Sequence, residues 1–266
     1  MNSKSLLRLL PFVAVSLASC AVSGGDSAWN GPHGSAFLGG FYSGLSGDLR
    51  TTDRVGPVKV KGTANMDSVG QGDDVFNPSG GVRLGFAPFE VGLSMFDYAE
   101  TGSGKFTGRF LGKTFTGKVR SDFDVRNIKG TAGLDLWNSE QARIAVVLGV
   151  DYLDMDLLVQ DLGTKISERI DEALPIPVVG VRGDVRLIED LRLAGEFVGM
   201  DLKVEDFNAT FFDLELALLY QFSANVEAFV GYRDLTIDFA GPLAKNQTVD
   251  ANLGLSGPIF GVGLRF

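Results

Sequence analysis

The sequence predicts an all-β fold, an antiparallel transmembrane β-barrel of about ten strands. Apolar and polar residues alternate with a period of two along most of the chain, the pattern of strands with two unlike faces. The connections between these strands are alternately long and short, as in barrels whose two ends face different compartments. No run of about 18 apolar residues exists that could form a membrane-spanning helix.

Residues 1–19 are predicted to be an export signal rather than part of the fold. Lys4 and Arg8 precede a short apolar run from Leu9 to Leu17, and no acidic residue interrupts it. A positive start followed by a short apolar segment is the composition of a signal peptide, and it is too short to span a membrane.

The export signal ends at the only cysteine of the chain, in the sequence Leu17-Ala18-Ser19-Cys20. These residues resemble a lipobox, the motif at which lipoprotein signal peptidase cuts before a lipidated cysteine. The resemblance implies that Cys20 is the lipidated first residue of the mature protein. Because Ala21 rather than Asp follows it, the same resemblance implies sorting to the outer membrane. Ordinary signal-peptidase cleavage after Ala21 is the alternative.

Residues 20–35 are predicted to be a flexible, lipidated tether, since they are small, polar and rich in glycine. The only histidine, His33, lies in this segment and is expected to be solvated. The predicted organisation is therefore a signal peptide over 1–19, the tether over 20–35, and a β-barrel over 36–266.

The first three predicted strands cover residues 36–49, residues 79–87 and a segment that begins at Phe89. Residues 50–78 are expected to be a long polar loop, and Pro88 marks a very short turn. In the second and third strands, glycine or polar residues separate the apolar ones. The apolar positions that define these strands are Phe37, Phe41, Leu45, Val82, Leu84, Phe86, Val91, Leu93 and Met95.

The next three strands are predicted over residues 121–137, 143–158 and 176–187. Residues 99–120 form a second long connection, which we expect to extend above the membrane. Residues 159–174 form a third, whose second part has the i,i+4 apolar spacing of a short helix, with plain loop structure as the alternative. The apolar positions are Ile128, Ala132, Leu134, Leu136, Ile144, Val146, Leu148, Val150, Tyr152, Val179, Val181, Val185 and Leu187.

The last four strands are predicted over residues 191–204, 210–222 and 226–238 and in a closing strand that ends at Phe266. A loop over residues 239–252 precedes the closing strand. The strand at 210–222 alternates without a break over about ten residues, the length that a tilted membrane strand needs. Eight strands remain open if one weak pair is loop, and twelve if part of the 99–120 connection is a hairpin in the wall.

The apolar face of these strands is predicted to point outward, toward lipid. A soluble barrel also alternates, but with its apolar face inward. Here the opposite face mixes glycine with charge, which would be costly as the core of a soluble barrel. Aromatic residues also gather where strands meet the short turns, as a membrane-interface girdle does; they are Phe86, Phe89, Trp137, Tyr220, Phe222 and Phe266.

The closing strand carries the most specific signal in the barrel. Apolar residues alternate to the last position, and the chain ends on an aromatic residue; the positions are Phe260, Val262, Leu264 and Phe266. This pattern resembles the closing strand of bacterial outer-membrane β-barrels, whose terminal Phe is read by the barrel-assembly machinery. The resemblance implies a bacterial outer-membrane location with a periplasmic N-terminus. It also implies outer-membrane lipid and lipopolysaccharide as surroundings and the barrel-assembly machinery as a partner during biogenesis. We expect a monomer.

The inward face of the predicted barrel holds equal numbers of positive and negative charges. Buried charges are tolerated only when paired, so the equal numbers predict a lumen filled by an ion-pair network. A strongly ion-selective pore would show an excess of one sign, and open aqueous channels need about 16 strands. The residues are Arg83, Glu90, Lys129, Asp135, Arg143, Asp151, Arg182, Asp184, Arg186, Arg192, Glu196, Asp213, Glu215, Glu227, Arg233 and Arg265.

No catalytic site, metal site or cofactor is predicted. Enzymes among small outer-membrane barrels commonly use a catalytic histidine, and here the only one lies in the tether. Carboxylate pairs at the upper strand ends are expected to be solvated rim charges, and the loop aspartates match no calcium-loop spacing; these residues are Asp122, Asp124, Asp154, Asp156, Asp73, Asp74 and Asp161.

Basic residues gather in the 99–120 connection, where they could hold lipopolysaccharide phosphates, or simply form a solvated hairpin. They are Lys105, Arg109, Lys113, Lys118 and Arg120. The whole chain is acidic, with a net charge of −9 that becomes −11 once residues 1–19 and their two basic residues are removed. This charge argues against a nucleic-acid partner.

The sequence therefore predicts a structural or surface-interaction barrel of the outer membrane that is not an enzyme. The alternative is a narrow channel or a carrier for small or apolar solutes. A lipid-modifying enzyme is the third hypothesis.

Overall fold

The computed structural model describes residues 32–55, 58–110, 113–204, 207–244 and 247–266. None of them forms a helix that is long and apolar enough to cross a membrane. The elements are β1 (Pro32–Val55), β2 (Val58–Asn65), η1 (Asp67–Val69), β3 (Val75–Phe86), β4 (Phe89–Phe110), β5 (Lys113–Asn138), β6 (Ala142–Asp161), β7 (Ser167–Ile188), β8 (Leu191–Val204), β9 (Phe207–Gln221), β10 (Val226–Ala244) and β11 (Gln247–Arg265).

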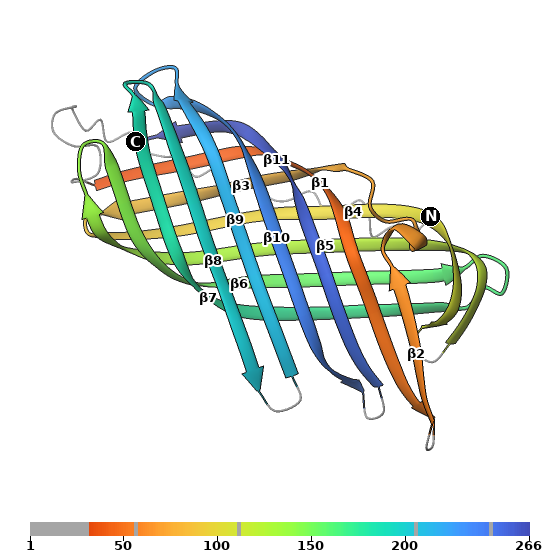
Figure 1. Ribbon diagram of the computed structural model, residues 1–266. Coiled ribbons are helices and arrows are strands. Elements are labelled where there is room, and N and C mark those ends of the chain that lie inside the picture. Colours follow the sequence, from red (N-terminus) through yellow and green to blue (C-terminus); the bar gives the residue numbers. More distant parts are fainter. Residues whose placement is uncertain (1–31, 56–57, 111–112, 205–206, 245–246) are drawn as a thin grey trace.

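The strands close into an antiparallel barrel, as predicted (Figure 1). Each strand from β3 to β11 pairs with the next, β1 pairs with β3, and β11 returns to β1, so the ring holds ten strands. At the closure, Gly34 N–H donates to Phe266 O at 2.7 Å and Phe266 N–H donates back at 2.9 Å. The additional strand β2 is hydrogen-bonded to the upper part of β1, on the side where β3 pairs with the lower part.

Several segments predicted as loops are strands. The predicted loop over 50–78 holds the end of β1, then β2, η1 and the start of β3. The connections at 99–120, 159–174 and 239–252 are long strand hairpins. The short helix considered in the third connection is wrong, because β7 already begins at Ser167. Tertiary pairing explains the difference. In these segments the outward residues are polar and the inward ones are apolar, so their composition is that of a polar loop although they form strands.

Residues 32–35, predicted as part of the tether, already belong to β1. Their backbone pairs with β3 on one side and, from Gly34 onward, with β11 on the other. The signal peptide and residues 20–31 lie outside the described residues.

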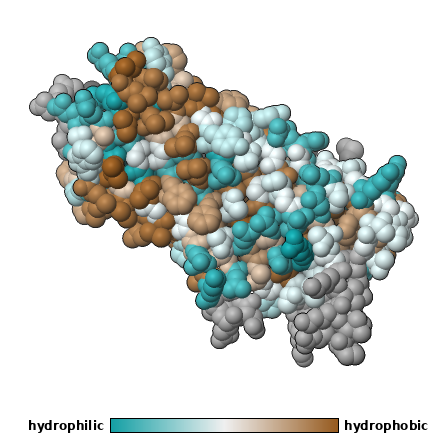
Figure 2. Space-filling model, in the orientation of Figure 1, coloured by the Kyte–Doolittle hydropathy of each residue, from teal (hydrophilic) through white to brown (hydrophobic). Residues whose placement is uncertain are grey.

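The long strands change which face is apolar part of the way along. On β6, Leu148, Val150 and Tyr152 point outward and are 59%, 49% and 39% exposed, whereas Leu153 and Met155 point inward and are buried. Paired strands switch at matching positions, so the switch forms a ring around the barrel. It divides the barrel into two halves. We call the half with the short turns, at the upper left of Figure 1, the lower half, and the half with the long hairpins the upper half. Figure 2 shows the result, with brown side chains over one half and teal and white ones over the other.

The lower half therefore carries an apolar outer belt. Its lower edge is the predicted aromatic girdle, in which Phe86 and Phe222 are more than half exposed. A second girdle, which the sequence analysis did not identify, marks the upper edge of the belt; its exposed residues are Tyr42, Phe76, Tyr152, Phe212 and Tyr232. In the first strand, Phe41 and Leu45 point inward and are buried, so the apolar face inferred there is the inner face, and Leu38 points outward.

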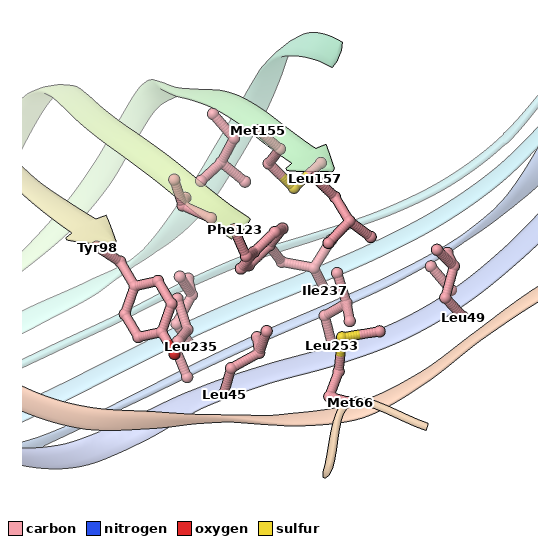
Figure 3. Close-up of a cluster of buried hydrophobic side chains, with 14 of the residues drawn as sticks. Leu45, Leu49, Met66, Tyr98, Phe123, Met155, Leu157, Leu235, Ile237 and Leu253 are labelled. Atoms are coloured by element: carbon pink, nitrogen blue, oxygen red, sulfur yellow. The ribbon is translucent and has the colours of Figure 1, made fainter. Parts of the chain in front are cut away.

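The upper half encloses an apolar core. Side chains of β4, β5 and β6 pack against side chains of β1, β10 and β11, as two facing sheets do (Figure 3). The side chains labelled in the figure are Leu45, Leu49, Met66, Tyr98, Phe123, Met155, Leu157, Leu235, Ile237 and Leu253. The core continues into a cluster of Phe106, Phe110 and Phe115 near the tip of the β4–β5 hairpin, with ring centroids 5.9 to 6.4 Å apart.

The turn η1 folds against the inner side of β4 and fills the gap between the β1–β2 hairpin and β4. Gly70 has a φ of 82°, and a Cβ at Gly102 would lie 1.5 Å from its carbonyl oxygen, so both positions require glycine. Gln71 donates to Ser121 Oγ at 2.7 Å, and the Glu100 carboxylate accepts the backbone N–H of Gly72. These contacts hold the turn inside the upper half.

Candidate functional site: the charged lumen

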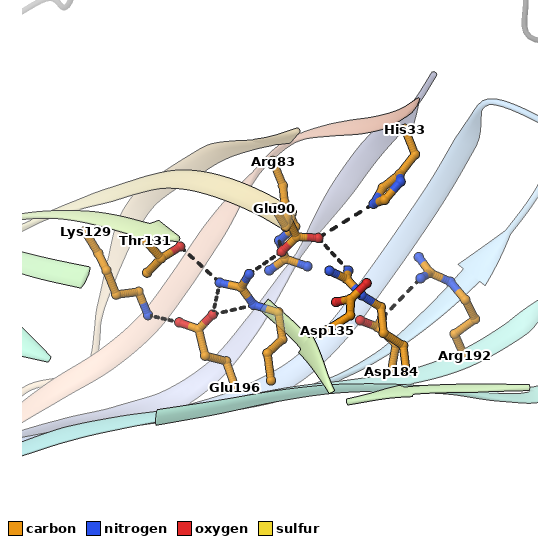
Figure 4. Close-up of polar contacts among 11 residues, drawn as sticks. His33, Arg83, Glu90, Lys129, Thr131, Asp135, Asp184, Arg192 and Glu196 are labelled. Carbon is orange, nitrogen blue, oxygen red and sulfur yellow. Dashed lines mark hydrogen bonds and ion pairs between the residues drawn. The ribbon is translucent and has the colours of Figure 1, made fainter. Parts of the chain in front are cut away.

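A continuous chain of ion pairs crosses the lumen of the lower half (Figure 4). Its centre is Glu90 on β4, whose side chain is 1% exposed. Arg143 donates to Glu90 at 2.5 Å and to Asp135 at 2.6 Å. Arg182 bridges Glu90 to Glu196, and its Nε donates to Glu196 at 2.7 Å. The predicted inner face of β4 to β8 is therefore joined across the barrel.

The same chain continues to the top of the lower half. Lys129 Nζ lies 2.6 Å from Glu196 and 2.7 Å from Asp213. Asp213 in turn accepts two hydrogen bonds from Arg233, at 2.9 and 2.8 Å. Two parallel hydrogen bonds between a guanidinium and a carboxylate fix the geometry of the pair as well as its charge.

Arg233 lies where the charged lumen meets the apolar core. Its guanidinium carbon is 4.7 Å from the centroid of Phe96 and 5.8 Å from that of Phe41. These two rings pack edge to face at 5.5 Å. A cation over an aromatic face is an attractive contact, so the rings close the polar region from above without leaving the charge unfavourably placed.

A second group of ion pairs lies nearer the short turns. Arg192 contacts Asp184 at 3.2 Å and Glu227 at 2.8 Å, and Arg265 approaches Glu227 at 4.0 Å. Arg83, on β3, lies 3.4 Å from Glu90 and therefore belongs to the first group.

Three of the predicted lumen charges form no ion pair within 4.0 Å in the part of the chain that the structure describes. Asp151 is buried and accepts a hydrogen bond from Asn127 instead. Glu215 faces the lumen and lies opposite Arg233 in the strand register. Arg186 lies at the lower end of β7 and is exposed, because the lumen opens to the short-turn side there.

His33 is not in a flexible tether, which corrects the expectation. It is the second residue of β1, and its Nε2 lies 3.8 Å from Glu90 Oε2. A Cβ at Gly85 would lie 2.2 Å from this nitrogen, so glycine leaves the room that the imidazole occupies. Sequence reasoning missed the contact because it depends on the register between β1 and β3, where His33 lies opposite Gly85.

One of the predicted loop aspartates accepts hydrogen bonds from the backbone. Asp161, at the end of β6, accepts hydrogen bonds from the N–H groups of Thr116, Gly163 and Thr164 at 2.8 to 2.9 Å. These donors, Thr116 first, lower the pKa of Asp161. Among the described residues no group of three or more His, Cys, Asp or Glu side chains is placed to hold a metal ion.

The basic residues of the 99–120 connection lie along the β4–β5 hairpin. Lys105 and Lys118 are directly opposite each other and exposed. Lys113 lies 3.5 Å from Glu168, and Arg120 lies 3.3 Å from Asp122. Acidic partners therefore accompany part of this set.

The residues of the predicted assembly signal lie on the outer surface of β11. Phe260, Val262 and Leu264 are 44%, 59% and 51% exposed. The ring of Phe266 lies over Gly34, where an added Cβ would be 2.3 Å away. Cys20, the predicted lipidation site, lies outside the described residues.

Comparison with known proteins gives weak structural likenesses and no sequence match. No protein-family model and no curated protein matches the chain. Ail, the attachment invasion locus protein of Yersinia pestis, solved with a heparin analogue, aligns over 89% of this chain and 99% of its own at a TM-score of 0.32 and 11% identity. Neisserial surface protein A aligns over 89% of this chain and 98% of its own, at a TM-score of 0.31 and 12% identity. A Pseudomonas aeruginosa FadL homologue aligns over 89% of this chain and 90% of its own, at a TM-score of 0.33 and 7% identity.

These neighbours are outer-membrane β-barrel proteins. Likenesses this low do not assign the chain to a family or to a role. The barrel architecture follows from the strand pairing itself.

Proposed function

We propose that this protein is an outer-membrane β-barrel with a closed lumen, whose upper half projects outside the cell and serves a structural or surface-interaction role. The observation that carries the proposal is the double closure of the interior. Ion pairs fill the lower half from Asp135 to Arg233, and the apolar core fills the upper half above Phe41 and Phe96.

The apolar belt supports the membrane placement. Large apolar side chains exposed in a continuous band would be an aggregation hazard in water but are expected in hydrocarbon. The band lies between two aromatic girdles, as in membrane barrels. The polar outer face above Tyr152, which includes Asp154 and Asp156, would then lie among headgroups and in water.

The N-terminal and biogenesis roles complete the proposal. Lipidation at Cys20 would hold the periplasmic end of β1 at the inner leaflet, because Pro32 lies at the short-turn end of the barrel. The outward row that ends at Phe266 would be read by the barrel-assembly machinery. Outer-membrane lipid and lipopolysaccharide would surround the belt. Lys105 and Lys118 would lie at the level of the lipopolysaccharide phosphates or above it. We propose no catalytic role and no cofactor.

Electrical recording tests the closed lumen. The refolded protein is inserted into planar lipid bilayers, and its folding is checked by its heat-dependent gel mobility. We expect no discrete conductance steps from the native protein. Reproducible steps would contradict the proposal and favour the channel hypothesis. A variant that removes the centre of the plug, Glu90→Ala with Arg182→Ala, serves as the control that should leak if it folds.

A further inference from the structure

The barrel wall is interrupted between β7 and β8. The ladder between these strands ends at the pair Val179–Gly199. The neighbouring ladders continue far beyond this level, β6–β7 to Gln160–Ser167 and β8–β9 to Val204–Phe207. In Figure 1, β8 to β11 accordingly diverge from β3 to β7 toward the hairpin end.

Two prolines explain where the ladder stops. Arg186 N–H donates to Gln141 O at 2.7 Å, so the even-numbered residues of β7 turn their N–H groups toward β6. Backbone N–H groups alternate along a strand, so the odd-numbered residues turn theirs toward β8. Pro175 and Pro177 are the next odd-numbered residues above Val179, and proline has no N–H to donate.

The interruption, which we call the β7–β8 slot, begins within the apolar belt. Pro177 and Pro175 lie opposite Val150 and Tyr152 of β6, which are belt residues. On the other side of the slot, Gly199 lies opposite Phe212, a member of the upper girdle. The slot therefore opens at the level of the outer-leaflet hydrocarbon and continues upward.

Apolar inner side chains line the slot and remain partly accessible. On β7 these are Ile170 and Leu174, and on β8 they are Met200 and Leu202; Leu202 points inward and is still 36% exposed. Leu235 also points inward, but its strand, β10, is paired with β9 on one side and β11 on the other, and Leu235 is 0% exposed. The interruption of the wall thus coincides with an exposed part of an otherwise buried apolar surface.

We propose that the β7–β8 slot binds a hydrocarbon chain of an outer-leaflet lipid, which enters sideways from the membrane. The inference rests on the proposed membrane placement of the belt, with which the slot is continuous. A strand from a second copy is disfavoured as occupant, because two prolines and the exposed charges Arg169 and Asp171 line this edge of β7. A flexible apolar chain needs no hydrogen bonds from the wall, so the missing donors do not oppose it.

Fluorescence quenching by brominated lipid tests the proposal. Trp29 and Trp137 are replaced by Phe, and single tryptophans are introduced as Leu174→Trp in the slot, Leu235→Trp in the sealed interior and Phe212→Trp on the belt. Each variant is refolded into vesicles of phosphatidylcholine with or without bromine on one acyl chain. Folding is verified by heat-dependent gel mobility before measurement.

The expected result is strong quenching at 212, at least half as much at 174, and little at 235. Quenching at 174 no greater than at 235 would overturn the slot proposal. Absence of quenching at 212 would instead contradict the membrane placement, so the two failures are distinguishable.

A second variant tests the role of the prolines. Pro175→Val with Pro177→Val restores two N–H donors and should let the β7–β8 ladder extend. We expect quenching at 174 to fall toward the value at 235 in this background. Unchanged quenching would overturn the conclusion that the prolines hold the slot open.

Discussion

At the level of single residues, Glu90 shows how the lower lumen tolerates buried charge. Its carboxylate meets three arginines, and each of those arginines except Arg83 also meets a second carboxylate. Removing one partner from such a set leaves an uncompensated charge in a medium that solvates it poorly. The cost of a substitution should therefore depend on whether the residue has partners.

Arg182 and Arg186 provide a matched test of this dependence. Both are inward-facing arginines on β7, but Arg182 bridges two glutamates, whereas Arg186 is exposed and forms no ion pair within 4.0 Å among the described residues. We expect Arg182→Met to lower the free energy of unfolding by about 3–5 kcal/mol and Arg186→Met to change it by less than about 0.5 kcal/mol. Urea unfolding of the protein in lipid vesicles measures both. An effect of Arg182→Met on the free energy of unfolding as small as that of Arg186→Met would show that the network does not contribute to stability.

Asp161 makes a prediction about pH. Because its pKa in the folded protein is lowered below the ordinary value of 3.8, its hydrogen bonds stabilise the β6–β7 turn fully above that pH. This contribution is lost as the pH falls through the lowered pKa. We expect the amide resonances of Thr116, Gly163 and Thr164 to titrate together with a midpoint below 3.8, and not to titrate in Asp161→Asn. A midpoint at or above 3.8 would contradict the assigned hydrogen bonds.

At the level of elements, the switch of the apolar face decides which part of each strand would meet lipid in the proposed membrane placement. Below the switch the apolar residues of a strand are those that point outward, and above it they are those that point inward. The same strand can therefore face hydrocarbon in one half and water in the other. The strand runs on without a break, so the boundary lies inside an element rather than at its end.

Lysine substitutions on β6 test this boundary. Leu148 and Gln160 share the outward face of β6, below and above the switch respectively. We expect Leu148→Lys to destabilise the vesicle-inserted barrel by about 2–4 kcal/mol, while Gln160→Lys has little effect. Urea titration of both variants in the same vesicles provides the comparison. A similar cost at both positions would place the boundary elsewhere.

The η1 turn makes a second prediction at this scale. Valine at Gly102 would collide with the carbonyl of Gly70, whereas Ser103, its neighbour, points outward. Forced overpacking costs about 1–3 kcal/mol, so Gly102→Val should displace the turn and Ser103→Val should not. Amide hydrogen exchange at Gln71 and Gly72 measures this, with faster exchange expected only in Gly102→Val. Unchanged protection in Gly102→Val would show that the turn docks differently.

At the level of the whole molecule, closure joins segments far apart in the sequence. Ser46 on β1 and Gly254 on β11 are 208 positions apart, yet Ser46 Oγ donates to Gly254 O at 3.3 Å. A Cβ at Gly254 would lie 2.9 Å from Ser46 Oγ, which suits a disulfide between two cysteines.

A disulfide across the seam tests the closed ring. In a Cys20→Ser background, Ser46→Cys with Gly254→Cys should crosslink on mild oxidation, and the heated, unreduced chain should migrate as a closed loop. The control pair, Ser46→Cys with Ser103→Cys, should not crosslink within the monomer. Failure of the first pair in folded protein would contradict the β1–β11 pairing.

The sequence by itself determined the barrel class and the lower half, and it favoured ten strands while leaving eight and twelve open. Period-two alternation on strands such as β9 and β11 is a local property, and apolar side chains outside with charge inside make it visible along the chain. The balanced lumen charges could be identified for the same reason, since Arg182 or Asp213 on an otherwise apolar strand is conspicuous.

Only the tertiary structure decided the upper half, the partners of each charge and the slot. Above the switch, Phe123 and Met155 alternate with outward polar residues, and nothing local says that a facing sheet covers them. Ion-pair partners such as Arg182 and Glu90 are 92 positions apart in the chain. The same holds for His33 beside Glu90 and for the gap at Pro175 and Pro177. Strand register is a long-range property, and side-chain contacts across a barrel follow from register rather than from local sequence.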